Sequence, residues 1–134
     1  MIGRPNDFVD VLSGKDRDHK LDYLIFNFHG DKGRFCMTVL DHDVYEDKEP
    51  KGEFFDHQDV VRYANFKNVK VIAAGCTLAG CTLGTQQLAM AFLKSGCHSY
   101  IGPHNYIDGN SNLMFLIKFM YEIIDNKADR TKGI

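Results

Sequence analysis

The feature that most constrains the fold is a set of three short runs rich in strand formers, each ending at a glycine that lies next to a histidine, cysteine or proline. The runs and the residues that end them are Tyr23–Phe28 before His29-Gly30, Val71–Ala74 before Gly75-Cys76, and His98–Gly102 before Pro103-His104. Short apolar runs rich in strand formers indicate β-strands. We expect the first to be buried on both faces of a sheet, and the second to be buried as well.

Segments with helical spacing separate these strands. Asp56 can N-cap one helix, Thr85 can cap a second that stops at Gly96, and Asp108 or Asn110 can open a third. The third helix has so few polar positions that we expect it to be largely buried. The alternation of strands and helices predicts an α/β fold in three layers, with a mainly parallel sheet flanked by helices.

The remaining segments predict the domain organisation. Residues 1–20 are polar and indicate an N-terminal arm or short helix, residues 21–125 form the α/β domain, and residues 126–134 form a polar C-terminal tail. Within the domain, Phe35–Leu40 predicts a further short strand. The stretch Asp41–Glu53 holds six acidic residues against two lysines and indicates a solvated loop, or a segment that gates a substrate.

Composition excludes several classes of function. The chain has 134 residues, 44% of them hydrophobic, and a net charge of -2, which is typical of a soluble single domain. A basic stripe for nucleic acid is missing, and so are a membrane-spanning run of about 18 apolar residues and a signal peptide. We expect a cytoplasmic protein that binds neither nucleic acid nor membranes. Its four cysteines are then reduced.

Two of the strand ends carry a pair of residues suited to acyl transfer. A thiol becomes a strong nucleophile beside an imidazole that takes its proton, and His29 and Cys76 supply these two groups. Parallel neighbours end at one edge of a sheet, so we expect the two side chains to share a crevice. The N–H groups of Gly30 and Cys76 could form the oxyanion hole.

At these two motifs the chain resembles the caspase-like cysteine peptidases, and most closely their CHAT branch. LIFNFHG is similar to the family's strand ending in His-Gly, and VIAAGCTLAG to its strand ending in the catalytic Cys. The separation of 47 positions (76 minus 29) is close to the spacing of about 50 in caspases. The segment from Gln86 to Ile124 also resembles the helix, strand and helix that follow the Cys in CHAT proteins, so the resemblance covers residues 21–125.

The resemblance implies a cysteine endopeptidase. His29 would be the general base and acid, Cys76 the nucleophile, and a peptide or protein the substrate, hydrolysed through an acyl-enzyme without metal or organic cofactor. His104, Asn105 and Asp108 follow the third strand and are candidates for a substrate pocket. The resemblance does not imply the preference of metacaspases for basic residues. The Asp that helps to select them lies two positions before the Cys, and here that position is Ala74.

The family's fold also implies a partner. A caspase-like sheet has about two strands before the His strand, and we expect this core to lack them. The strand Tyr23–Phe28 would then be an apolar edge, which proteins normally cover. We expect a second copy, a partner subunit or the N-terminal arm to cover it.

Other readings of the cysteines and of the fold remain open. Cys81 follows Cys76 by five positions and could be an alternative nucleophile, a resolving thiol or a core residue. A zinc site from Cys76, Cys81, Cys97 and His98 has spacings that suit no familiar structural motif. The chain could also be a catalytically inactive regulatory or assembly module of the same fold. A flavodoxin-like ligand-binding domain lacks the expected phosphate loop.

Overall fold

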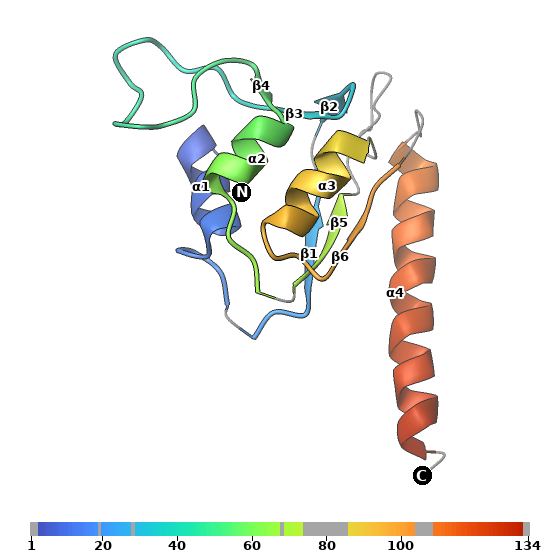
Figure 1. Cartoon of the computed structure of the whole chain (residues 1–134). Helices are drawn as coiled ribbons and strands as arrows, with labels where there is room; N and C mark the ends of the chain where they lie inside the picture. The colour runs from blue at the N-terminus through green and yellow to red at the C-terminus, as the bar shows by residue number, and fades with distance from the viewer. Residues whose placement is uncertain are drawn as a thin grey trace.

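The computed structural model describes residues 3–18, 20–27, 29–67, 69–73, 86–103 and 109–132. In chain order, one helix is followed by four strands, and helices and strands then alternate to the end of the described residues (Figure 1). They are α1 (Pro5–Ser13), β1 (Tyr23–Phe26), β2 (Gly30–Asp31), β3 (Arg34–Cys36), β4 (Phe54–Phe55), α2 (His57–Tyr63), β5 (Lys70–Ala73), α3 (Gln86–Lys94), β6 (Ser99–Ile101) and α4 (Gly109–Lys132).

Three of the strands form a parallel sheet in the order β1-β5-β6. In the register of β1 and β5, Tyr23 lies opposite Lys70 and Phe26 opposite Ala73. β6 pairs with the other side of β5, and α3 connects these two strands. The predicted mixed α/β fold with a parallel sheet is therefore confirmed. β1 lies at an edge of this sheet among the described strands, as expected.

A second, antiparallel sheet of β2, β3 and β4 was not predicted. Lys32 and Gly33 both have positive φ, 50° and 76°, and join β2 to β3 in a two-residue hairpin turn whose twist suits the flanking strands. The predicted strand Phe35–Leu40 is thus shifted and shorter, since β3 ends at Cys36. Phe54–Phe55, at the end of the acidic stretch, supplies the third strand.

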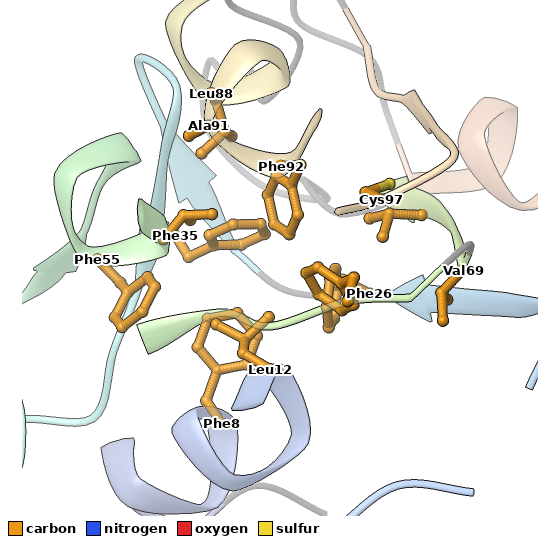
Figure 2. Packing of buried hydrophobic residues seen from close by; sticks show 13 residues of the cluster. Phe8, Leu12, Phe26, Phe35, Phe55, Val69, Leu88, Ala91, Phe92 and Cys97 are labelled. Carbon is orange, nitrogen blue, oxygen red and sulfur yellow. The ribbon is translucent and has the colours of Figure 1, made fainter. Parts of the chain in front are cut away.

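A cluster of phenylalanine rings forms the centre of the core (Figure 2). Phe8 from α1 makes edge-to-face contacts with Phe26, Phe35 and Phe55, at centroid distances of 5.3, 5.3 and 5.0 Å. Phe92 from α3 packs against Phe26 and Phe35 from the other side. The N-terminal segment is therefore a helix of the core, and the cluster joins both sheets to the helices.

Several local predictions are confirmed. Asp56 N-caps α2, because its carboxylate accepts hydrogen bonds from the backbone N–H groups of Gln58 and Asp59 at 2.9 and 3.1 Å. The predicted apolar face of α3, formed by Leu88, Ala91 and Phe92, is buried. Gly96, just after the end of α3, has a φ of +96°, a conformation that glycine adopts without strain.

Two expectations about burial are wrong. α4 lies beside the rest of the chain, beyond the β6 edge (Figure 1), and most of its large apolar side chains are exposed. Ile25 in β1 is 41% exposed, so this strand is not buried on both faces. α4 also runs to Lys132, through most of the predicted polar tail. None of the helices in the described ranges has the length and hydrophobicity of a membrane span.

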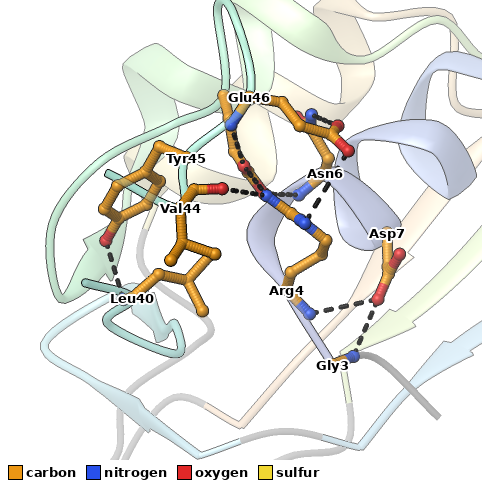
Figure 3. Close-up of polar contacts among 9 residues, drawn as sticks. Gly3, Arg4, Asn6, Asp7, Leu40, Val44, Tyr45 and Glu46 are labelled. Carbon is orange, nitrogen blue, oxygen red and sulfur yellow. Dashed lines mark hydrogen bonds and ion pairs between the residues drawn. The ribbon is translucent and has the colours of Figure 1, made fainter. Parts of the chain in front are cut away.

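The acidic stretch is mostly exposed, as predicted, but it is tied to the start of α1. Glu49 has a fully buried carboxylate that accepts two hydrogen bonds from Arg4, at 2.9 and 2.6 Å, and one each from the backbone N–H groups of Asn6 and Glu46. Arg4 also donates to the carbonyl of Val44, and Asn6 to Glu46 (Figure 3). These bonds to Arg4 lower the pKa of Glu49 from 4.5 to about 2, against the opposing effect of burial.

The lowered pKa predicts a pH-dependent contribution to stability. Because the folded pKa lies below the unfolded one, Glu49 stabilises the fold fully above pH 4.5, and this contribution is lost as pH falls through about 2. We expect Glu49→Gln to lower the urea midpoint at pH 7, and the difference from the wild type to shrink progressively below pH 4.5. Glu53→Gln changes an exposed carboxylate and serves as the control. A difference for Glu49→Gln that is constant from pH 7 to pH 2 would contradict the assignment.

Candidate active site

His29 lies where the chain leaves the parallel sheet and enters the antiparallel one. It follows the last residue of β1 by three positions and precedes the first residue of β2. Its side chain is exposed, and its carbonyl accepts a hydrogen bond of 2.8 Å from the N–H of Cys36. The imidazole is thus accessible at the carboxyl end of β1, while the backbone beneath it is held by β3.

The register of the parallel sheet relates His29 to the second predicted strand end. Every paired residue of β5 is 47 positions after its partner in β1, as in Tyr23 with Lys70 (70 minus 23). His29 and Cys76 have the same separation (76 minus 29), and each follows the last paired residue of its strand by three positions. The prediction that the two strands are parallel neighbours ending at one edge is confirmed. Cys76 itself lies outside the described residues.

Other predicted site residues also fall outside the described ranges. These are Cys81, the cap Thr85, and the pocket candidates His104, Asn105 and Asp108. β6 pairs Ile101 with Ile72, so the segment before His104 leaves the sheet at the same edge as β1 and β5. The structure therefore brings together the three strand ends that the sequence singled out.

Gly30, the predicted oxyanion donor, is buried at the start of β2. Gly30 lies opposite Phe35 in the ladder of β2 and β3. The next pair along this ladder is His29 and Cys36, which are joined by the hydrogen bond from the Cys36 N–H to the His29 carbonyl. Opposite pairs in an antiparallel ladder alternate between bonded and non-bonded types. The backbone N–H of Gly30 is thus directed away from β3.

Cys36 is a neighbour of His29 that the sequence reasoning missed. Residues directly opposite in an antiparallel pair project their side chains from the same face, so Cys36 and His29 share the outer face of the second sheet. Partial burial raises the pKa of the Cys36 thiol, the carboxylates of Asp31 and Glu53 raise it further, and Arg34 opposes them. The protonated thiol is therefore favoured. Recognising the Lys32-Gly33 turn would have revealed this pairing.

The charges beside His29 are already paired with one another. Arg34 lies 3.8 Å above the ring of Phe54 and 3.3 Å from the carboxylate of Asp31. Both residues occupy the same outer face as His29, because they alternate with the buried Gly30 and Phe35. This face consequently offers an exposed imidazole next to an ion pair and an aromatic ring.

The remaining described cysteine has a structural environment. Cys97 is buried, its thiol donates to the carbonyl of Ser99 at 2.7 Å, and burial raises its pKa. Within the described ranges, no three His, Cys, Asp or Glu side chains are grouped closely enough to hold a metal ion. The proposed zinc ligands Cys76 and Cys81 are outside these ranges.

No family model, curated protein or solved structure matches the chain. Its function has to be inferred from the residues and from their arrangement at the sheet edge.

Proposed function

We propose that the chain is a cysteine endopeptidase of the caspase-like type, with Cys76 as nucleophile and His29 as general base and acid. The observation that supports this most is the shared register. The two residues are as far apart in sequence as the residues that pair across β1 and β5, and both follow the paired strands by three positions. Their positions suit a dyad across two neighbouring strand ends.

In the proposed reaction, the imidazole of His29 takes the proton of the Cys76 thiol, and the sulfur forms a bond to the carbonyl carbon of a peptide. The C–N bond then breaks, and the protonated His29 gives its proton to the leaving amine. Water, deprotonated by His29, then attacks the thioester carbonyl. The C–S bond breaks and releases the carboxylic acid product, and the protonated His29 returns its proton to the Cys76 thiolate. Removing a general base from such a site typically slows the reaction by about 10²–10⁴-fold.

The two described cysteines are poorer candidates for the nucleophile. Cys97 is buried and hydrogen bonded, and Cys36 has a raised pKa although it is opposite His29. Thiolate is the reactive form, and both environments disfavour it. The register and these two environments therefore support Cys76 as the nucleophile. Cys81 follows His29 by 52 positions (81 minus 29) and does not share the separation of 47 between paired residues of β1 and β5.

A second candidate function is a non-catalytic assembly module of the same fold. The exposed apolar residues of α4 favour it, because such surfaces commonly mark interfaces. The two functions differ in one observable, which is the reactivity of Cys76. An assembly module does not need an activated thiol.

Iodoacetamide labelling distinguishes the two functions. We expect Cys76 to be modified at least about tenfold faster than Cys97, because a thiolate paired with an imidazole is the reactive species. His29→Ala should reduce the Cys76 rate towards that of an ordinary exposed thiol. Quantitative mass spectrometry of the labelled peptides measures each cysteine separately.

Two controls sharpen this measurement. Cys36→Ser removes the other thiol next to His29, so that a loss of labelling in His29→Ala can be assigned to Cys76. His42→Ala removes an exposed imidazole whose nearest ion-pair partner is Asp43, and it should leave the Cys76 rate unchanged. Slow, uniform labelling that His29→Ala does not alter would reject the peptidase and favour the assembly module.

A further inference from the structure

A pocket of about 330 Å³ lies where the strands of the parallel sheet begin. Its walls are the end of α1 and the residues after it, the segment that follows α2, and Val69, which precedes β5. The backbone N–H of Asn65 donates to the carbonyl of Leu12 at 2.9 Å and so joins the first two walls (Figure 1). Sites for small molecules usually have volumes from about 300 Å³ upwards, so this pocket can hold a small ligand.

Arg17 is fixed in the pocket wall by carbonyl groups at the end of α1. Its Nη1 atom donates to the carbonyls of Val11 and Leu12 at 3.0 and 3.2 Å, and its Nη2 atom to that of Asn65 at 2.8 Å. The guanidinium carbon lies 4.7 Å from the centroid of the Phe66 ring. The Nε–H and one Nη2–H have no hydrogen-bond partner among the described residues, and these two donors remain for a ligand.

The positive charge of Arg17 is not paired with an acidic group in the described part of the chain. Arg4 and Arg34 form ion pairs with carboxylates, whereas Arg17 is in none of the ion pairs between described residues. Partial burial lowers the pKa of Arg17. Charged groups that are withdrawn from water are normally paired, and a bound anion would supply the missing charge. Lys67, exposed at the same pocket, adds a second positive charge.

The other polar groups of the pocket suit hydroxyl groups of a ligand. Asp18 is the one carboxylate among the lining residues that the structure describes, and one of its oxygens accepts a hydrogen bond from the N–H of Lys20 at 2.8 Å. The hydroxyl of Ser13 donates to the carbonyl of Asp10 at 3.3 Å, so its oxygen can still accept. The side-chain amide of Asn65 can donate and accept.

We propose that this pocket binds a small phosphate monoester that carries hydroxyl groups, with the phosphate against Arg17 and Lys67 and the hydroxyl groups towards Asp18 and Asn65. A phosphate monoester carries a charge of about −1.5 to −2 at pH 7, which matches the two cations. Guanidinium groups bind phosphate oxygens through pairs of N–H donors. A single carboxylate would leave one of the two positive charges unmatched.

The pocket is separate from the candidate active site. Because β1 and β5 are parallel, the residues before β5 lie at the opposite end of the sheet from His29, which follows β1. The proposed site therefore does not depend on the reaction of His29 and Cys76, and it is compatible with either proposed function.

Isothermal titration calorimetry of the full chain with glycerol phosphate tests the proposal. We expect a dissociation constant below about 1 mM. Inorganic phosphate should bind at least about threefold more weakly, because it lacks the hydroxyl groups that would contact Asp18 and Asn65. Glycerol should not bind. The absence of binding by glycerol phosphate, or equally tight binding of inorganic phosphate or of malate, would overturn the proposal.

Two variants place the ligand in the pocket. Lys67→Met should raise the dissociation constant of glycerol phosphate about three- to fivefold, as expected for an exposed charge pair. Arg17→Gln should raise it by about tenfold or more, because hydrogen bonds between charged groups are lost. Circular dichroism checks the fold of Arg17→Gln, since this side chain also binds the end of α1.

Lys94→Met is the matched control. It removes the same charge from an exposed lysine at the end of α3 that does not line this pocket, and it should leave the dissociation constant unchanged. Lys67→Met decides the question even if Arg17→Gln fails to fold, because Lys67 makes no side-chain hydrogen bond or ion pair with the described residues. Binding that Lys67→Met leaves unchanged, or that Lys94→Met weakens equally, would show that the ligand does not occupy the pocket.

Discussion

Phe8→Ala is expected to destabilise the fold by about 3–5 kcal/mol, the usual cost of truncating a buried phenylalanine. The Phe8 ring is fully buried and contacts three other rings, from β1, β3 and β4. The variant loses both the transfer free energy of the ring and the contacts that surround the cavity. Urea unfolding, followed by far-UV circular dichroism, measures the change in the free energy of unfolding.

Two variants define the specificity of this result. Phe8→Leu keeps most of the volume and should cost considerably less than the alanine variant. Phe115→Ala makes the same substitution on α4, where the ring is 46% exposed and stacks only at 5.7 Å on Phe119. If Phe8→Ala were no more destabilising than Phe115→Ala, α1 would not be part of the core.

Gly96→Ala is expected to cost about 2–6 kcal/mol, since backbone strain of about 1–3 kcal/mol adds to a similar cost of overpacking. Gly96 has φ of +96°, and a Cβ atom there would lie 2.0 Å from the carbonyl oxygen of Phe66. That oxygen belongs to the backbone, so a side-chain rotation cannot relieve the overlap. The neighbouring hydrogen bond from Phe66 N–H to the Ser95 carbonyl, 2.7 Å long, would be disturbed as well.

Gly52→Ala provides a matched control for this prediction. Gly52 has φ of +106°, but a Cβ atom there would meet nothing within 4 Å. The two variants share the backbone strain and differ in the overlap, so the difference between their urea midpoints reports the close approach of the turn to Phe66. Equal losses of stability would show that the backbone of residue 66 can move away.

Local sequence signals predicted the elements whose cause is local. Asp56 caps α2 because a carboxylate at that position reaches the free N–H groups of the first turn. Gly96 was identified as the end of α3 because few other residues adopt its φ. The apolar runs predicted β1 and β5, and the helix between β5 and β6 implied that these strands are parallel. None of these predictions needed information from distant residues.

Predictions that depend on long-range packing were less accurate. The antiparallel sheet was missed because β2 and β4 have two residues each and become strands only by pairing with β3. Cys36 was consequently not recognised as the residue opposite His29. The apolar composition of α4 predicted burial, but within the described ranges six of its large apolar side chains stay exposed.

The sequence by itself determined the α/β class, the alternation of helices and parallel strands from α2 to α4, and the placement of His29 at a strand end, because periodicity and capping are encoded within a few residues. Only the tertiary structure decided the common register of 47 positions between β1 and β5, the pairing of Cys36 with His29, and the exposure of α4. The reason is physical. Register, cross-strand neighbours and burial are properties of which segments meet, and residues far apart in the chain settle that jointly.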